Sequence, residues 1–555
     1  MTPETYVPSH LLIAPLLIPI VAGALMLFYD DKLRKIKLGI GLAAIVALFF
    51  VSLELISRVK GDALGGGETI VATYLLGDWP VPIGIVLVVD RLSAMMVMLT
   101  TLIAAPALIY AAAGWQGKGQ HFHTLFQLLL AGVIGAFLTG DLFNLFVFFE
   151  VMLAASYGLM LHGSGPERIK QGLHYIAINL AASLLFLIGA ALAYGTTGTL
   201  NMADMSRVVP LLDPAQRMMF HAAAAFLGLA FLTKAAIWPL CFWLPSTYAA
   251  ASPPAAASFA IMTKVGLYVL LRLATLLFGH DAGISAGFGG PVLILGGMAT
   301  IAYGMFGVLG AQGVAIKGGY IALISSGTVL SAVGISLIGG GTEILSGALF
   351  YLIGSTVAIS AYFLLAEPVG RGWEGKGEDD TQGPDPVAER WAPMMGTVED
   401  ETAPASDRTA PWSALGFSFA LIAAILAGLP PFPGFIGKVA MLSGAFHDNT
   451  SASGAIPTIL WVYAALLILS GFAVLVSLVR LGIRRFWASG KPPERMLALE
   501  IVPVFLILAM LVLQTVKAGP LLNYTHATAL DLAAPAVYRN AVLSAPVVAD
   551  SGGSH

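Results

Sequence analysis

The sequence predicts an all-α polytopic membrane protein, and two observations support this prediction. Hydrophobic residues make up 58% of the 555 residues and charged residues only 11%, whereas about a quarter of the residues in a soluble globular protein are charged. Apolar stretches of the roughly 20 residues that a bilayer-spanning helix needs also recur along the whole chain. The net charge of −3 shows no basic excess that would indicate nucleic-acid binding. The one cysteine, Cys241, excludes a disulfide framework and a cysteine-based metal cluster.

Fourteen stretches of this kind are present, and each is predicted to form a transmembrane helix. In chain order they cover residues 11–29, 36–57, 88–113, 122–140, 143–161, 174–195, 220–242, 256–278, 291–310, 317–338, 345–366, 412–429, 457–481 and 497–517. The first is expected to be a retained helix and not a cleaved signal peptide, because no Lys or Arg precedes it. An even number of spans places both chain ends on the same side of the membrane.

Basic residues in the loops predict which side that is. Lys and Arg are more numerous in the loops after odd-numbered spans than after even-numbered spans, even when the long loop 371–410 is left out. Since cytoplasmic loops carry an excess of Lys and Arg, the odd-numbered loops are expected to be cytoplasmic. Both termini then face outward, to the periplasm or the extracellular side.

Two segments outside the spans have distinctive compositions. Residues 367–411 are rich in Gly, Pro, Asp and Glu and lack apolar periodicity, which predicts a flexible cytoplasmic linker. A loop that docks a partner is the alternative. Residues 531–543, DLAAPAVYRNAVL, have a weak amphipathic pattern and are expected to lie at the membrane interface on the outer side.

Four ionisable residues lie in or beside apolar stretches, namely Glu150, Lys234, Lys264 and Lys438. A charge at the centre of a bilayer costs about 3 kcal/mol and normally faces a bundle interior or a water-filled cavity. Four unpaired charges would cost roughly 10 kcal/mol, which is comparable with the whole stability of a fold, about 5–15 kcal/mol. They are therefore expected to pair, hydrate or titrate, as in a proton relay. Fixed ion pairs that hold helices together are the alternative interpretation.

Two of these lysines lie beside prolines that interrupt their helices. Pro239 follows Lys234 in the sequence FLTKAAIWPL. The prolines that precede Lys438 are Pro430, Pro431 and Pro433. Proline removes a backbone donor and breaks the helical hydrogen-bond ladder, and interrupted helices within membranes line cavities in ion-translocating proteins. One such helix in each half of the chain is typical of transporters built from inverted repeats.

Other ionisable residues near the span ends have simpler interpretations. His162 and His174 flank the loop between the fifth and sixth spans, where they could admit protons from the cytoplasm or merely be solvated. Asp90 and Arg91 are expected to form a surface pair, and Lys317 to extend towards the membrane surface. No metalloprotease, P-loop, nucleophile-elbow or dinucleotide-binding motif occurs in a credible context. No cofactor or metal site is therefore expected.

Three sequence motifs resemble those of a known family. They are DLFNLFVFFEVMLAASY around Glu150, TKAAIWPLCFWLP around Lys234, and GLPPFPGFIGK ending at Lys438. These motifs are similar to the antiporter-like subunits shared by respiratory complex I, membrane-bound hydrogenases and Mrp-type multisubunit cation/proton antiporters. The resemblance spans most of the fourteen-helix region, and the motif around Glu150 is most similar to the D subunit of Mrp (also called Mnh or Pha) antiporters.

The resemblance implies two inverted five-helix repeats with discontinuous helices seven and twelve. Helices 1–3 then occupy residues 1–121, helices 4–8 form the first repeat (122–278), helices 9–13 form the second (279–481), and residues 482–555 hold helix 14 and the tail. The resemblance also implies a relay in which Glu150 on helix five pairs with Lys234 on helix seven. Lys264 on helix eight and Lys438 on helix twelve continue that relay.

The chain departs from the family pattern in the middle of this relay. Gly354 lies where relatives often carry a histidine, and Ile359 where some carry a lysine. The tenth span offers only hydroxyls, from Ser325, Ser326 and Thr328. A continuous path from Lys264 to Lys438 would therefore depend on water and these hydroxyls.

The expected function is that of a proton-translocating subunit in a multisubunit antiporter that exchanges protons for Na⁺ or K⁺. Such a subunit is a secondary transporter component and not an enzyme, and needs no cofactor. Its expected partners are other hydrophobic subunits, membrane lipid, H⁺, and Na⁺ or K⁺, in a bacterial inner membrane. The alternative is a proton-pumping subunit of a complex I or hydrogenase-type redox complex. A third interpretation, an integral membrane enzyme or assembly scaffold, would need polar catalytic groups clustered at one membrane face.

Overall fold

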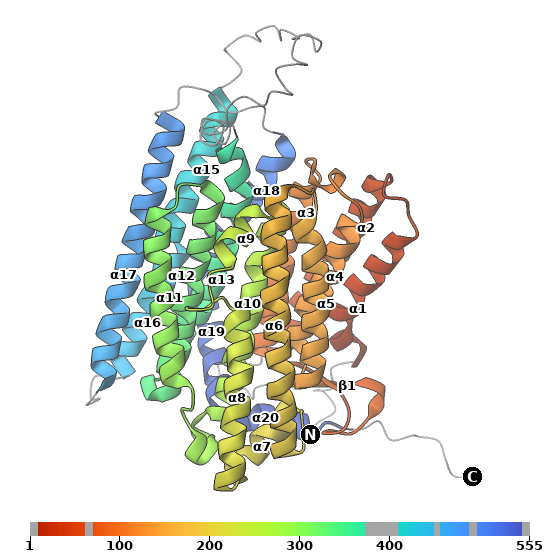
Figure 1. Ribbon diagram of the computed structural model, residues 1–555, viewed down its shortest axis with the longest axis vertical. Helices are drawn as coiled ribbons and strands as arrows, with labels where there is room; N and C mark the ends of the chain where they lie inside the picture. Colours follow the sequence, from red (N-terminus) through yellow and green to blue (C-terminus); the bar gives the residue numbers. More distant parts are fainter. Residues whose placement is uncertain (1–8, 61–69, 372–408, 449–454, 488–496, 547–555) are drawn as a thin grey trace.

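The computed structural model describes residues 9–60, 70–371, 409–448, 455–487 and 497–546, and these form a bundle of helices (Figure 1). Within them, 12 helices are long and apolar enough to cross a membrane, and two shorter apolar helices cover Phe122–Leu138 and Ala414–Ala427. The prediction of an all-α polytopic membrane fold is confirmed. Of the predicted linker 367–411, residues 372–408 lie outside the described part of the chain.

The elements follow one another in a regular order along the chain. They are α1 (Ser9–Leu27), α2 (Arg34–Val59), β1 (Ala72–Leu75), β2 (Val86–Val89), α3 (Arg91–Ala111), α4 (Phe122–Leu138), α5 (Leu142–Leu161), α6 (Pro166–Thr197), α7 (Met202–Val208), α8 (Pro214–Lys234), α9 (Leu244–Ala250), α10 (Pro253–Phe278), α11 (Gly290–Gly310), α12 (Val314–Ile335), α13 (Glu343–Gly370), α15 (Thr409–Ala427), α16 (Pro433–Asp448), α17 (Ala455–Gly482), the π-helical turn η8 (Ile483–Trp487), α18 (Ala498–Val516), α19 (Ala518–Ala533) and α20 (Pro535–Leu543).

The seventh and twelfth predicted spans are discontinuous, as the prolines predict. In the first break, α8 ends at Lys234, Ala236 takes a positive φ of 54°, and α9 begins only after Pro239. In the second, α15 ends at Ala427, Gly428 takes a φ of 80°, and α16 begins at Pro433. Glycine adopts this left-handed conformation at little steric cost, which makes Gly428 well suited to end a helix.

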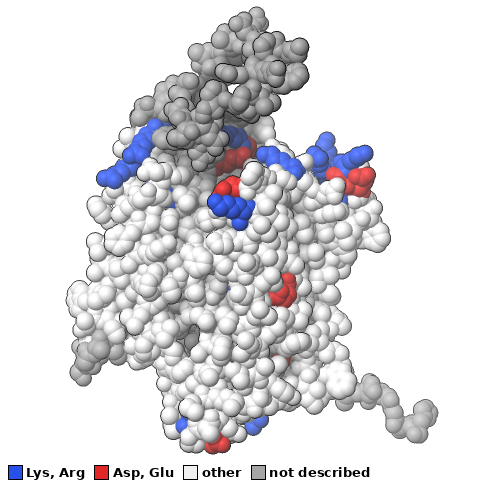
Figure 2. All heavy atoms as spheres, in the orientation of Figure 1, with Lys and Arg blue, Asp and Glu red and all other residues white. Residues whose placement is uncertain are grey.

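Three helices form the centre of the bundle. The helices α10, α12 and α13 are buried along almost their whole length and occupy the middle of the view in Figure 1. Helices such as α6 and α17 instead expose apolar side chains such as Leu184 and Phe472, as expected for surfaces that face lipid or other subunits. The middle of the visible face is almost free of charge, and basic side chains gather at its upper end (Figure 2).

A short hairpin near the N-terminal helices was not expected from the sequence. Strands β1 and β2 pair antiparallel, with Ala72 opposite Val89 and Leu75 opposite Val86. The second strand is fully buried, and its Leu87 also bridges to Thr139 at the end of α4. Because Val86 to Val89 continue directly into an apolar helix, their sequence alone does not separate a strand from the first turn of that helix.

The expected surface pair of Asp90 and Arg91 is wrong, because both side chains are buried and each has a distant partner. Asp90 binds Arg272 of α10, with Nη1 and Oδ2 at 2.6 Å, and caps α3 by accepting from the Ser93 N–H at 2.9 Å. Arg91 binds Asp531 of α19 at 2.6 Å. The Arg272 guanidinium and the Ser93 N–H therefore compensate the buried Asp90 carboxylate for the water that it has lost.

Replacing Arg272 with Met should lower the free energy of unfolding by about 3–5 kcal/mol, because it leaves the buried Asp90 carboxylate without its counter-charge. The measurement is denaturant unfolding of the purified chain in detergent. The double variant Asp90→Asn, Arg272→Met should recover part of this loss, since it removes the unpaired charge as well. Equal losses for the single and double variants would mean that the ion pair is not the source of the effect.

The tail packs against the bundle end opposite the basic one. The helix α20 buries Pro535, Tyr538 and Val542 and contacts α7 and β1, which agrees with the weak amphipathic pattern of residues 531–543. The ring of Tyr538 lies 4.9 Å from the Arg272 guanidinium. The apolar face of this segment is therefore covered by protein.

Candidate proton pathway

Glu150 and Lys234 are connected through a hydroxyl that could not be identified from the sequence. Ser183 of α6 donates to Glu150 Oε1 at 2.6 Å, and Lys234 Nζ donates to Ser183 Oγ at 3.4 Å. Both ionisable residues belong to the described part of the chain, and they form no direct ion pair there. The expected Glu150–Lys234 pairing is therefore corrected to a bridged arrangement. A hydroxyl can accept from one group while it donates to the other.

Lys234 lies at a helix end that favours its charge. It is the last residue of α8, where the exposed carbonyls give a helix terminus a partial negative charge. Its Nζ also lies 4.9 Å from the ring centroid of Phe149, a cation–π contact. Phe149 in turn packs against Phe231, and Phe231 against Phe186. These rings surround the Glu150–Ser183–Lys234 group with apolar surface.

Lys264 is held by the hydroxyls that the sequence placed in the middle of the path. Its side chain is fully buried, and its Nζ donates to Ser325 Oγ at 3.0 Å and to Ser326 Oγ at 3.3 Å, both on α12. Gly266 lets α10 pass close to the break after Lys234, because a Cβ there would lie 2.9 Å from the Ala235 nitrogen. Because Gly266 has no side chain, α10, which carries Lys264, can lie close to the end of α8, which carries Lys234.

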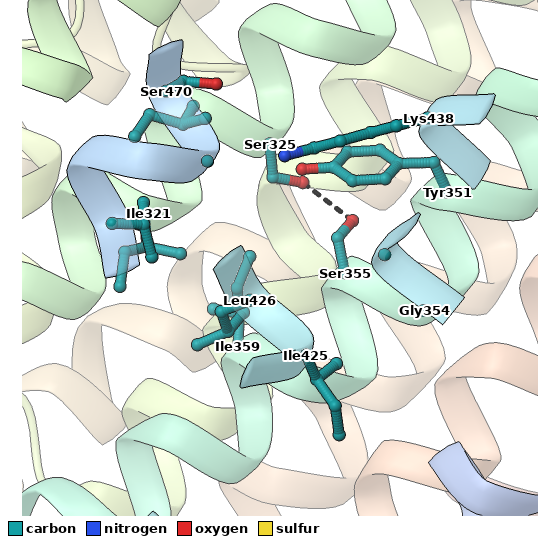
Figure 3. Close-up of a pocket in the computed structure, with 14 residues that line it drawn as sticks. Ile321, Ser325, Tyr351, Gly354, Ser355, Ile359, Ile425, Leu426, Lys438 and Ser470 are labelled. Carbon is teal, nitrogen blue, oxygen red and sulfur yellow. Dashed lines mark hydrogen bonds between the residues drawn. The ribbon is translucent and has the colours of Figure 1, made fainter. Parts of the chain in front are cut away.

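A small cavity connects the Lys264 hydroxyls to Lys438. Ser325 shares a hydrogen bond of 2.9 Å with Ser355 of α13, and both line a cavity of about 10 Å³ together with Tyr351 and Lys438. That volume is close to the smallest, about 10–15 Å³, that admits a water molecule. Figure 3 shows the Lys438 ammonium and the Tyr351 hydroxyl pointing towards Ser325. Ser355 and Tyr351, which the sequence did not single out, therefore lie in the gap between Lys264 and Lys438.

Gly354 has a packing role at this point of the path. A Cβ on Gly354 would lie 3.0 Å from Pro433 Cβ and 3.1 Å from the side-chain amide of Gln514. The bare glycine therefore lets α16 and α18 approach α13, where a histidine could not fit without displacing them. Gln514 occupies this space and donates to the Phe350 carbonyl at 3.3 Å.

Lys438 resembles Lys234 in its contact with a broken helix. Its Nζ donates to the carbonyl of Ala427, the last residue of α15, at 3.3 Å, and to the Leu467 carbonyl of α17 at 3.5 Å. Both lysines therefore lie near a helix end at a break. Carbonyl groups without helical partners at such an end stabilise the positive charge of the lysine side chain.

A larger cavity of about 270 Å³ lies at the basic end of the bundle, between α9, α10, α12 and the end of α13. Glu367 lines it and accepts from Trp115 Nε1 at 2.8 Å and from the Tyr110 hydroxyl at 3.2 Å. Arg371 lies 3.2 Å from the same carboxylate. These three contacts hold the Glu367 side chain in place, which makes it a structural anchor of this cavity.

Buried hydroxyls next to that cavity indicate water. Thr247 and Ser252 have no hydrogen-bond partner among the described residues, and they flank Tyr248 and Ala251, which line the cavity. Buried polar groups in native proteins are nearly always satisfied by protein or ordered water. The cavity has room for several waters, so hydration would reach from the basic end to the start of α10, the helix that carries Lys264.

The two candidate histidines have different environments. His162 is buried, its Nε2 lies 2.9 Å from the Trp115 carbonyl oxygen, and burial lowers its pKa, so the imidazole is neutral at pH 7. His174 lies on the exposed side of α6, with its ring 6.3 Å from that of Phe242. The structure does not bring them together as one site, and their role in admitting protons stays a prediction.

The arrangement can store and pass protons but offers no evident metal site. Among the described residues, no group of three or more His, Cys, Asp or Glu side chains could hold a metal ion. The ionisable groups are instead spaced along the bundle, with Ser183 between Glu150 and Lys234 and with Ser325 and Ser326 beside Lys264. The residues that sequence reasoning missed are Ser183, Tyr351, Ser355 and Glu367. A serine in an apolar helix carries no local signal that separates a relay from helix packing.

This chain is similar to known proteins in both sequence and fold. Residues 139–375 match the family described as NADH:quinone oxidoreductase/Mrp antiporter, TM. A chain in the Mrp complex from Dietzia sp. DQ12-45-1b has the same fold, with a TM-score of 0.77 at 24% identity, covering 98% of this chain and 100% of that one. A chain of the archaeal membrane-bound sulfane sulfur reductase has a TM-score of 0.76 at 22% identity, covering 96% and 99%.

Two relatives match along nearly their whole length. A protein of Rhizobium meliloti (strain 1021), named as the D subunit of a probable K⁺/H⁺ antiporter, is 49% identical, over 97% of this chain and 98% of the relative. The D subunit of the Na⁺/H⁺ antiporter of Alkalihalophilus pseudofirmus is 32% identical, over 96% and 99%. The chain therefore belongs to the D-subunit family of Mrp-type multisubunit cation/proton antiporters, which is related to the membrane subunits of complex I.

Proposed function

We propose that this chain is the proton-translocating subunit of a multisubunit monovalent cation/proton antiporter, with Glu150, Lys234, Lys264 and Lys438 as its relay. The observation that carries the proposal is the alternation of ionisable groups and hydroxyls across the bundle. Ser183 lies between Glu150 and Lys234, and the hydroxyls of α12 and α13 lie between Lys264 and Lys438. A fixed ion-pair framework, the alternative, would favour direct contacts between opposite charges, as Asp90 and Arg272 make.

Protonation of Glu150 would start the movement of charge. The neutral acid attracts Lys234 less than the carboxylate does, so Lys234 would lose a proton more readily to its neighbours. The released proton would pass along the lysines through hydroxyls and water. In the predicted orientation the basic end is cytoplasmic, and protons flowing inward would drive cation efflux, a direction implied by the family resemblance.

The exchanged cation is proposed to be K⁺ or Na⁺, with K⁺ favoured. The relative that is 49% identical is named as part of a probable K⁺/H⁺ antiporter, whereas the relative from a Na⁺/H⁺ antiporter is 32% identical. The described residues hold no group of three or more acidic, His or Cys side chains that could bind such a cation, so the proposal places no cation site in them.

Sister membrane subunits are the proposed partners, in a bacterial inner membrane. Glu150 is only half-buried, and its neighbours Val147, Val151 and Leu184 are exposed. A carboxylate so close to a lipid-facing surface is costly, and cover by another subunit would lower that cost. The runner-up, a subunit of a redox-driven proton pump, rests on the 22% identical chain of the sulfane sulfur reductase, a likeness of fold alone.

Purification of the tagged chain in mild detergent, followed by reconstitution, tests the function. We expect small hydrophobic subunits without redox centres to copurify, and the vesicles to show a pH change on addition of K⁺ or Na⁺. Titration with each cation then measures the preference. Copurification of iron–sulfur or flavin proteins, or a pH change that requires an electron donor, would favour the redox complex instead.

Replacing Ser183 with Ala should slow cation-dependent proton transport by several-fold without preventing assembly. The change removes the only described bridge between Glu150 and Lys234, but a water molecule can replace the hydroxyl in part. The measurement is the initial rate of pH change in vesicles. Ser183→Thr keeps the hydroxyl and serves as the matched control. A Ser183→Ala variant as fast as wild type would show that the bridge does not limit transport.

A further inference from the structure

A separate cavity of about 130 Å³ lies at the basic end, where the end of α11, the start of α12 and the end of α17 meet. Three basic side chains line it, namely Lys317, Arg480 and Arg484. None of the residues that line the cavity is acidic. Basic side chains gather at the upper left of the molecule, where α17 ends (Figure 2). The relay does not use this cavity.

Lys317 was expected to extend to the membrane surface, but it is buried, with a relative exposure of 6%. Its Nζ donates to the Val308 carbonyl at 2.9 Å and to Ser477 Oγ at 2.6 Å. The ammonium group has three donors, so one remains for a further acceptor. Both partners are neutral, and no described acidic side chain forms an ion pair with Lys317.

The positive charges around Lys317 increase the free-energy cost of burying its ammonium group. Arg480 and Arg484 are exposed at the mouth of the cavity, and both act electrostatically on the Lys317 ammonium. Like charges that converge on a partly dehydrated space repel one another. An anion in the cavity would remove this repulsion and would accept charge-assisted hydrogen bonds from all three side chains.

We propose that this cavity binds the phosphate of an anionic phospholipid headgroup. Phosphate is a favoured partner of arginine guanidinium groups, and basic pockets between transmembrane helices on the cytoplasmic side bind phospholipid headgroups. A free phosphate ion would satisfy the same donors. The lipid is favoured because exposed apolar side chains on α11, α17 and η8 either line the cavity or lie within three residues of a lining residue, and these could contact acyl chains: Phe306, Leu309, Val479 and Ile483.

The test is lipid titration of the full chain, purified with its copurifying subunits, delipidated and followed by native mass spectrometry. We expect short-chain phosphatidylglycerol to bind more tightly than phosphatidylcholine. The double variant Arg480→Gln, Arg484→Gln should weaken phosphatidylglycerol binding about 30-fold, since each basic residue near an anionic headgroup contributes roughly fivefold. The matched control is Lys35→Gln, Lys170→Gln, which removes two exposed charges from the same end of the bundle and should leave the affinity within twofold.

Three results would overturn the proposal. Equal binding of phosphatidylcholine and phosphatidylglycerol to the wild type would remove the need for an anionic group. An equal loss of affinity in the test and control variants would assign the effect to general surface charge. Displacement of phosphatidylglycerol by an equal concentration of inorganic phosphate would mean that the cavity binds a free anion and not a lipid.

Discussion

Replacing Glu150 with Gln should reduce cation-dependent proton transport at least tenfold in an assembled complex. The amide has almost the same shape and still offers an oxygen to Ser183, which donates to Glu150 at 2.6 Å. It cannot bind and release a proton near neutral pH, however, and the loss of a group that transfers protons typically costs a hundredfold or more in rate. The measurement is the initial pH change that K⁺ or Na⁺ induces in vesicles, normalised to the amount of assembled complex.

Glu54→Gln is the matched control for this experiment. Glu54 also lies on a predicted transmembrane helix, but it is exposed and forms an i,i+4 pair with Arg58 at 2.7 Å. Exposed pairs of this kind contribute about 0–1 kcal/mol, so its replacement should leave transport close to that of the wild type. If the Glu150→Gln complex transported protons at the wild-type rate, the relay would have to begin at another group.

The sequence predicted the elements of the fold because lipid imposes a strict rule on length and composition. Each of the fourteen predicted spans corresponds to described helix, and the prolines identified both interrupted spans. Hydropathy detects a helix from its own residues alone. It could not detect the β1–β2 hairpin, whose second strand is as apolar as the helix that follows.

Residues of the candidate site could be predicted from the sequence only where their side chain is by itself costly to place in a membrane. A lone Glu or Lys in an apolar stretch stands out, and so Glu150, Lys234, Lys264 and Lys438 were found. Serines do not stand out, because their hydroxyls are common in helix interfaces within membranes. The contacts that Ser183 makes with Glu150 and Lys234, and that Ser355 makes with Ser325, depend on which helices meet, and that information lies in the tertiary fold.

Charged residues near span ends were misjudged for the same reason. Asp90 and Arg91 are adjacent in sequence, yet their partners lie 182 and 440 residues away. Lys317 is buried through contacts with α11 and α17. Sequence spacing describes neighbours along one helix, whereas these side chains are paired across the bundle.

Replacing Lys438 with Met or with Arg should stop most proton transport, again by at least tenfold, and the pair of variants separates two roles. Met removes the charge and keeps an unbranched apolar side chain, whereas Arg keeps the charge but does not lose its proton at any pH the protein meets. If Lys438 only stabilises the carbonyls at the end of α15, which it contacts at 3.3 Å, the Arg variant should transport nearly as well as wild type. If Lys438 must release its proton, both variants should fail alike, because neither has a side chain that can change its charge.

Copurification of the sister subunits confirms that each variant assembles, which matters for the larger Arg side chain because Gly428 and Gly471 lie close to the ammonium. Transport rescued by Arg would therefore assign Lys438 to the framework of the broken helix, and end the relay at the hydroxyls of Ser325 and Ser355.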